Sequence, residues 1–250
     1  MKKNVVFLIN IVSNERSKNQ RYDLAVKSWK DWADKNNHET LVLTEQIADL
    51  DYMRPNWYKL YAFDLLDSTG IDYDQILYAD SDTIVHPDMP DVFQMSENKF
   101  CAVPAIGSFD WICRSLENYS KYLFDGFTFP YWKYFNSGFM IFNENHKKLF
   151  SDIKQFYDMN RDLIVEIQTK LAVGTDQPVL NFFIQKDKID IKYFPYEYNM
   201  QDLNRFEILG NDLLFTKWGY VYHFNAIPNN HDAKITNYFM EKTYDYLSQT

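Results

Sequence analysis

The stretch Gln75-Ile76-Leu77-Tyr78-Ala79-Asp80-Ser81-Asp82-Thr83-Ile84-Val85 is an apolar run that ends in two carboxylates separated by one residue. Its apolar part predicts a buried strand through Ile76, Leu77 and Tyr78, from which the chain leaves the sheet at Asp80. Two acidic groups this close together repel each other unless a cation or water lies between them. Oxygen ligands of this kind suit Mg²⁺ or Mn²⁺. The triplet therefore indicates a metal site, with a polar turn after a strand as the alternative interpretation.

Strand and helix patterns alternate on the N-terminal side of this stretch. Nearly continuous apolar residues over Asn4–Val12 predict a first strand that is covered on both faces. Apolar residues at helical spacing predict a helix on each side of a short strand at Glu39–Thr44. This order predicts a parallel α/β sheet with right-handed crossovers. Because ligands bind outside the carboxyl ends of such strands, the loop after Val12 and the Asp80/Asp82 corner should share one crevice.

The second half of the chain gives shorter patterns. Its expected elements are strands over 99–105 and 135–142, a helix over about 147–159, a helix that begins at 175, short strands over 189–193, 213–215 and 221–224, and a terminal helix over 232–247. The aromatic segment 109–132 has no pattern that assigns it to a helix or a strand. No repeat, linker or low-complexity segment interrupts the chain, so we expect a single domain over residues 1–250.

Composition and charge restrict the class of protein. Hydrophobic residues make up 46% and charged residues 24% of the chain, which is the balance of a soluble globular protein. A net charge of −9 without a basic stripe argues against nucleic-acid binding and against a metal-dependent nuclease. The two cysteines, Cys101 and Cys113, form neither a disulfide framework nor a zinc pattern. Without a signal peptide or an apolar stretch of transmembrane length, we expect a cytoplasmic protein.

Three further motifs follow the acidic triplet. They are Phe135-Asn136-Ser137-Gly138-Phe139, Gly174-Thr175-Asp176-Gln177-Pro178-Val179-Leu180-Asn181 and Val221-Tyr222-His223-Phe224. In this order, the four motifs resemble the retaining nucleotide-sugar glycosyltransferases of the glycogenin and lipopolysaccharide galactosyltransferase type, glycosyltransferase family 8, up to about Pro228. The resemblance implies one GT-A (Rossmann-like) domain with a mostly parallel central sheet flanked by helices. It also implies a nucleotide-binding half (1–105), a donor-sugar and acceptor half (106–231) and a C-terminal helix (232–250).

The resemblance implies a metal site of three side chains. Asp82 matches a direct metal ligand, Asp80 matches a residue that holds both metal and ribose, and His223 matches the histidine that completes the shell. One imidazole nitrogen together with carboxylates suits Mn²⁺, with Mg²⁺ as the alternative. Considered alone, His223 would more often be a half-buried histidine with satisfied hydrogen bonds, but its position in the series of motifs reverses that preference.

The resemblance also implies contacts to the donor. Asn136 matches an asparagine that reaches the donor sugar, and Gly138 beside it allows close backbone approach, although a glycine bulge is an alternative. Asp176 and Gln177 match a pair near the anomeric carbon, and both could also cap a helix. The remaining matched positions flank the nucleotide and the acidic corner: Ile11, Ser13, Arg54, Lys59 and Ser81.

The implied reaction is metal-dependent transfer of a sugar from a nucleotide diphosphate sugar, a UDP-sugar, to a hydroxyl acceptor such as a glycan or lipid-linked saccharide. Retention requires either a covalent intermediate, for which Asp176 is the candidate carboxylate, or attack by the acceptor on the same face of the sugar. The aromatic segment Tyr119–Tyr134 is expected to bind the acceptor. An aromatic core, or a contact between two copies in a homodimer, is the alternative for this segment.

One departure from the family pattern keeps other functions open. The family follows its histidine with Gly-x-x-Lys-Pro-Trp, whose lysine binds the diphosphate, whereas this chain continues Phe224-Asn225-Ala226-Ile227-Pro228. Lys234 or the cation alone would have to replace that lysine. The alternative is a non-catalytic nucleotide-sugar or glycan-binding module with a degenerate transferase site. A sugar-phosphate nucleotidyltransferase is disfavoured, because its Gly-rich phosphate loop has no counterpart in Ile11–Lys18.

Overall fold

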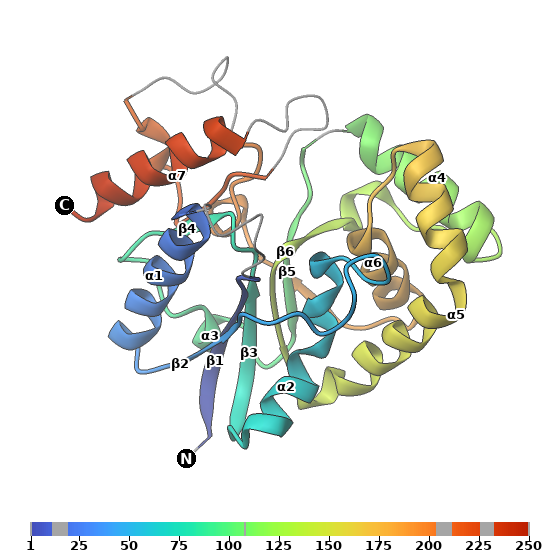
Figure 1. Cartoon of the computed structure of the whole chain (residues 1–250), viewed down its shortest axis with the longest axis horizontal. Coiled ribbons are helices and arrows are strands. Elements are labelled where there is room, and N and C mark those ends of the chain that lie inside the picture. Colours follow the sequence, from blue (N-terminus) through green and yellow to red (C-terminus); the bar gives the residue numbers. More distant parts are fainter. Residues whose placement is uncertain (1, 12–19, 108, 204–211, 226–232, 250) are drawn as a thin grey trace.

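The computed structural model describes residues 2–11, 20–107, 109–203, 212–225 and 233–249. A six-stranded sheet of order β2-β1-β3-β6-β5-β7 forms its centre (Figure 1). The strands are β1 (Lys3–Ile9), β2 (Glu39–Leu43), β3 (Tyr73–Ala79), β5 (Phe100–Pro104), β6 (Phe135–Asn143) and β7 (Ile191–Tyr193). Strand β6 runs antiparallel to both of its neighbours, and the other pairs are parallel. The expected mostly parallel sheet is confirmed.

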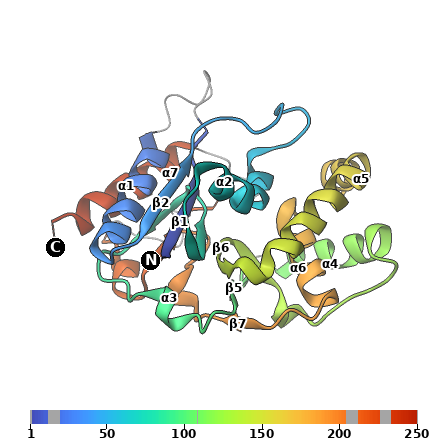
Figure 2. The same ribbon diagram turned by 90° about the horizontal axis from the view of Figure 1, so that it is seen from below.

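Helices cover both faces of the sheet, as two perpendicular views show (Figures 1 and 2). One side carries α1 (Gln20–Lys35) and α7 (Ala233–Leu247), with the short α3 (Val92–Met95) near one end of the sheet. The other side carries α2 (Ala62–Thr69), α4 (Phe109–Leu123), α5 (Lys147–Leu171) and α6 (Asp176–Lys186). Short 3₁₀ helices complete the list: η1 (Pro55–Tyr61), η2 (Tyr131–Lys133), η3 (Glu144–His146), η4 (Tyr196–Tyr198) and η5 (Leu214–Lys217).

The apolar residues of the central strands explain why both faces are covered. In β1, Val5 and Phe7 belong to the core under α2, α5 and α6, whereas Val6 and Leu8 belong to the core that contains Trp29 of α1. Successive side chains of a strand point to opposite faces, so a strand with cores on both sides is apolar throughout. Each such side chain contributes about 1.5–3 kcal/mol when fully buried. The predicted first strand is confirmed, but it ends at Ile9 rather than at Val12, which lies outside the described residues.

A separate two-stranded sheet brings distant parts of the chain together. Strand β4 (Thr83–Val85) pairs antiparallel with β8 (Val221–His223), and Thr83 lies opposite His223. Apolar residues of β4 and β8 share a hydrophobic cluster with α1 and α7. The pairing places the end of β8 beside the turn that follows β3.

The structure assigns one segment that the sequence left open and corrects two expectations about secondary structure. The unassigned segment 109–132 contains α4 and most of η2. The expected strand over 213–215 is wrong: η5 begins at residue 214, and Leu213 has a φ of 51°, which a strand excludes. Helix α5 continues far beyond residue 159, because Ile164 and Ile167 extend its buried face. The terminal helix is confirmed as α7.

Half of the aromatic side chains at 119–134 are buried in the core. Tyr119, Phe124, Phe129 and Tyr134 are buried, so the alternative of an aromatic core is confirmed for these residues. On the surface of the same segment, Trp132 is 73% exposed and Tyr122 is 43% exposed. Across the described ranges, no helix combines the length and the apolar character that crossing a membrane requires.

Candidate active site

Strand β3 delivers the acidic corner. The chain leaves the sheet at Asp80, whose backbone N–H donates to the carbonyl oxygen of Gly138 in β6 at 2.9 Å. The hydroxyl of Ser81 donates to the carbonyl oxygen of Ile9 at the end of β1. The turn is thus tied to both strands that flank β3. This bonding gives the two carboxylates a fixed backbone rather than a free loop.

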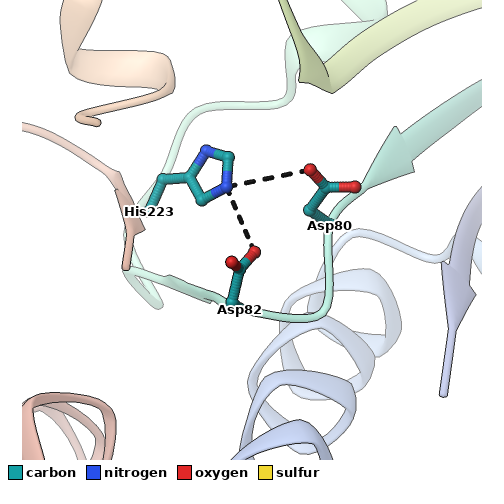
Figure 3. Close-up of side chains that lie close together, drawn as sticks. All are labelled: Asp80, Asp82 and His223. Carbon is teal, nitrogen blue, oxygen red and sulfur yellow. Dashed lines mark ion pairs between the residues drawn. The ribbon is translucent and has the colours of Figure 1, made fainter. Parts of the chain in front are cut away.

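Three side chains meet at this corner (Figure 3). Nε2 of His223 lies 3.1 Å from Oδ1 of Asp82 and 3.7 Å from Oδ2 of Asp80. One ligand atom from each residue lies within 4.8 Å of the other two. The N–H of Phe224 donates to the carbonyl oxygen of Asp82 at 2.8 Å, which extends the β4–β8 pairing to the site. Two carboxylates and one imidazole fit the preferences of Mn²⁺, and Mg²⁺ would also accept the oxygen ligands.

The charge of His223 depends on its two acidic neighbours. The side chain is buried, and burial alone would lower its pKa because it disfavours the charged imidazolium. The negative charges of Asp82 and Asp80 outweigh this effect and raise the pKa above its usual value of 6.5. Without a cation, the imidazole therefore keeps its second proton at pH values where an ordinary histidine has lost it. A divalent cation has to displace that proton before it can bind Nε2.

We expect the apparent affinity for Mn²⁺ to fall as the pH decreases through the raised pKa of His223, because proton and cation compete for Nε2. Calorimetric titration with Mn²⁺ from about pH 5.5 to about pH 8.5 would measure the effect. The variant His223→Gln should bind more weakly and lose this pH dependence. An affinity of the unaltered protein that stays constant over that range would contradict the role of His223.

Lys59 connects the acidic corner to α6. Its Nζ lies 2.9 Å from Oδ2 of Asp176 and 3.5 Å from Oδ1 of Asp80, and the residue is 1% exposed. It also donates to the carbonyl and hydroxyl oxygens of Ser137 at 3.2 and 3.1 Å. Burial lowers the pKa of Lys59, but the two carboxylates outweigh burial and raise it. Lys59 lies beside the acidic corner as expected, yet as a buried cation beneath the site rather than as a surface contact for a nucleotide.

Asp176 and Gln177 begin α6, and both side chains contact Ser137 of β6, beside Lys59. Oδ1 of Asp176 accepts from Nδ2 of Asn56 at 2.7 Å, and Oδ2 accepts from the hydroxyl of Ser137 at 3.0 Å as well as from Lys59. Oε1 of Gln177 accepts from the N–H of Ser137 at 3.0 Å. Burial raises the pKa of Asp176, but Lys59 and the hydrogen-bond donors outweigh it and lower the pKa. Asp176 therefore stays ionised with both oxygens engaged.

Gly138 is where the backbone of β6 comes closest to the metal ligands. A Cβ at this position would lie 2.5 Å from Cε1 of His223 and 2.6 Å from Oδ2 of Asp80. The pairing of β6 with β5 also jumps here, from Met140 to Asn136, so Gly138 lies in an irregularity of the strand. Close approach and a bulge, the two interpretations of this glycine, therefore both hold.

We expect Gly138→Ala to fold but to bind Mn²⁺ about tenfold or more weakly, because its methyl group would push two ligands out of position. Titration with Mn²⁺ would measure the loss. Gly174→Ala is the control, because its Cβ would also be crowded, 2.7 Å from Cγ of Pro178, without touching a ligand or the segment that packs on His223. Equal losses of affinity in the two variants would show that general strain, rather than displacement of the ligands, is responsible.

A cleft of about 610 Å³ opens beside the acidic corner, a volume within the range of small-molecule sites. Five of the predicted residues line it: Ile11, Arg54, Asp80, Ser81 and Asp82. Arg54 is exposed and is the positively charged side chain among the described lining residues. Several other lining residues were not identified from the sequence: Ile9, Tyr22, Leu50, Pro55, Asn56 and Tyr78. Ser13 lies outside the described residues.

Asn199 is a further site residue that the sequence does not reveal. It follows η4, is 0% exposed, and its Oδ1 lies 2.9 Å from Nδ1 of His223. Its Nδ2 donates to Oδ1 of Asn136 at 2.9 Å. No spacing or motif marks Asn199, because its partners come from β6 and β8. The residues that would show what replaces the family's Gly-x-x-Lys, 226–232 and the side chain of Lys234, lie outside the described part.

The model of the glycosyl transferase family 8 matches residues 7–227, which is most of the chain. The chain belongs to glycosyl transferase family 8, and the match identifies it as a glycosyltransferase. This finding confirms the expected family and the expected class of enzyme. No curated protein sequence matches the chain.

Solved structures of glycosyltransferases match this chain. One is a glycosyltransferase involved in the glycosylation of the major capsid of PBCV-1, with a TM-score of 0.58 and 8% identity over 95% of this chain and 98% of that one. Another is the glycosyltransferase GlyE of Streptococcus pneumoniae TIGR4, with a TM-score of 0.48 and 13% identity over 99% of this chain and 62% of that one. The first likeness supports the glycosyltransferase fold.

Proposed function

We propose that the chain transfers a sugar from a nucleotide diphosphate sugar, a UDP-sugar, to a hydroxyl of a glycan or lipid-linked saccharide, with retention at the anomeric carbon. Asp80, Asp82 and His223 would hold Mn²⁺ or Mg²⁺. The observation that carries the proposal is the convergence of these three ligands at a cleft of about 610 Å³. The ligands and the cleft share Asp80 and Asp82, so a bound cation would lie where a diphosphate enters.

A divalent cation at this position would stabilise the negative charge that develops on the diphosphate as the sugar leaves. Arg54 lines the same cleft and is exposed, so its guanidinium can bind the diphosphate in place of the lysine that the family motif supplies. Ile11 and Tyr22 offer apolar lining for a nucleoside. These three residues and the acidic corner come from separate segments of the chain.

Asn136 has one half of its amide left for the donor sugar. Its Oδ1 accepts from the N–H of Gly138 at 2.8 Å and from Asn199 at 2.9 Å. Its Nδ2 donates no hydrogen bond to another group in the described part of the chain, and the residue is partly exposed. We assign this NH₂ group to a hydroxyl of the donor sugar.

Same-face attack by the acceptor agrees better with the surroundings of Asp176 than a covalent intermediate does. The carboxylate is 4% exposed, and its two oxygens are held by four donors: Lys59, Asn56, Thr175 and Ser137. A nucleophilic Asp176 would have to leave its ion pair with Lys59 and its hydrogen bonds at the same time. We therefore assign Asp176 and Gln177 to the wall of the sugar pocket.

A thermal-shift screen of nucleotide sugars, with and without Mn²⁺, tests the proposal. Ligands that bind the folded state raise its stability by mass action, by about 2.7 kcal/mol at a hundred times the Kd. We expect one nucleotide diphosphate sugar to give a Mn²⁺-dependent shift that Asp82→Ala abolishes. Release of the nucleoside diphosphate from that donor would exclude the non-catalytic alternative, whereas no shift with any donor would contradict the proposal.

A further inference from the structure

We infer that Asn199 is a positioning residue that fixes which nitrogen of His223 meets the cation. The backbone N–H of Gly138 orients the amide of Asn136, and Asn136 orients the amide of Asn199. The amide of Asn199 then sets the tautomer of the His223 imidazole. The inference rests on the proposed function only in taking the acidic corner as a cation site. It concerns groups that are not ligands themselves.

The first step is the orientation of Asn136. The N–H of Gly138 points at one atom of the Asn136 amide at 2.8 Å. A backbone N–H can only donate, so this atom has to be the oxygen, and the NH₂ group of Asn136 has to lie on the other side. The orientation of this amide therefore follows from the backbone and needs no assumption about neighbouring side chains.

The second step is the orientation of Asn199. The oxygen of Asn136 also lies 2.9 Å from the Asn199 amide. Two amide oxygens facing each other would repel, so the atom of Asn199 at this contact has to be Nδ2. The oxygen of Asn199 must then face the other way, towards His223.

The third step is the imidazole. Oδ1 of Asn199 lies 2.9 Å from Nδ1 of His223, and an amide oxygen can only accept, so Nδ1 has to carry a proton. The lone pair of neutral His223 is then on Nε2, the atom that faces Asp82 and Asp80. Nδ1 keeps its proton whether a proton or a cation occupies Nε2. Hydrogen bonds of this kind to the outer nitrogen are what orient histidine ligands of metals.

The backbone holds Asn199 in place for this role. The segment that follows it runs beside β8, where the N–H of His223 donates to the carbonyl of Met200 at 2.8 Å and the N–H of Leu203 donates to the carbonyl of His223 at 3.2 Å. Asn199 is 0% exposed, so no bulk water can replace a lost partner. A reversed Asn199 amide would place its oxygen against the oxygen of Asn136, so that two acceptors face each other.

Asn199→Leu tests the inference, because leucine has a similar volume but neither donates nor accepts. We expect the affinity for Mn²⁺ to fall by about 10- to 100-fold, the usual loss when the hydrogen-bond partner of a metal-binding histidine is removed. Asn143→Leu is the matched control: Asn143 is also a buried asparagine with hydrogen bonds through both amide atoms, at the opposite end of β6 from Asn136. This control should keep the full affinity for Mn²⁺.

Two further measurements separate positioning from simple packing. In ¹⁵N-histidine spectra of the metal-free protein, at a pH where His223 is neutral and with its signals assigned through His223→Gln, Nδ1 of His223 should be protonated, and Asn199→Leu should lose this preference. Asn199→Asp keeps an acceptor for Nδ1–H but loses the donor to Asn136, so it should bind Mn²⁺ more weakly than the unaltered protein and more tightly than Asn199→Leu. An Asn199→Asp variant as weak as Asn199→Leu would count against the acceptor role.

Unchanged Mn²⁺ affinity in Asn199→Leu, or a proton on Nε2 rather than Nδ1 of neutral His223 in the metal-free protein, would overturn the inference. Its failure can be distinguished from failure of the proposed function. If the unaltered protein binds Mn²⁺ and Asn199→Leu binds it more weakly, the inference holds even when no nucleotide sugar is turned over. If the unaltered protein binds no Mn²⁺, both the inference and the proposed function fail.

Discussion

Replacing Asp82 by alanine should abolish tight binding of Mn²⁺ and lower the rate of sugar transfer by about a hundred- to a thousand-fold, or about 3–4 kcal/mol of barrier. Of the two carboxylates, Asp82 supplies the oxygen nearer to Nε2 of His223, at 3.1 Å against 3.7 Å for Asp80, so its loss removes one of three ligands. Titration with Mn²⁺ and initial rates of nucleoside diphosphate release, with the donor found by the thermal-shift screen, would measure both effects.

A surface carboxylate provides the control for this variant. Asp88 lies after β4 and pairs with Lys35, and both side chains are exposed. Asp88→Ala therefore removes one negative charge of the same kind without touching the cleft, and it should leave Mn²⁺ affinity and rate nearly unchanged. If Asp82→Ala behaved like this control, the acidic corner would not be the cation site.

Replacing Lys59 by methionine should lower the free energy of unfolding by about 3–5 kcal/mol, the usual cost of removing one partner of a buried ion pair. Methionine fills a similar volume, so the loss would come mainly from the carboxylate of Asp176, which is 4% exposed and would keep an uncompensated charge. Denaturation with urea, followed by intrinsic fluorescence, would measure the change in the free energy of unfolding.

A second substitution tests the cause. In the double variant Lys59→Met/Asp176→Asn the buried charge of Asp176 is gone, so we expect much of the lost stability to return. Lys192→Met removes a partly exposed lysine that pairs with Glu97, and it should change the stability by less than about 1 kcal/mol. If the loss of stability in the double variant equalled the sum of the losses in Lys59→Met and Asp176→Asn, Lys59 and Asp176 would not be coupled.

The sequence was sufficient for features that depend on local patterns. The strand before Asp80 is a continuous apolar run because both of its faces are buried, and β1 is apolar for the same reason. The order of four motifs was enough to expect Asp80, Asp82 and His223 to come together. Their actual proximity depends on the β4–β8 pairing, which no local pattern encodes.

The parts that could not be predicted depend on partners distant in the sequence. Asn199 becomes a site residue only because β6 and β8 bring Asn136 and His223 to it. Lysine is almost never fully buried unless paired, so a sequence places Lys59 near the surface until two carboxylates are found around it. Helix α4 was not assigned because many aromatic residues in and after it obscured its helical spacing.

The pairing of Thr83 with His223 decides whether the imidazole faces the cation site at all. Side chains alternate between the two faces of a strand, so a slip of β8 by one residue would turn His223 away and present Tyr222 or Phe224 instead. The imidazole therefore stays at the cation site only if this one register survives. An insertion or deletion that shifts the register by a single residue would remove the imidazole from the cation site, even in a protein that still folds.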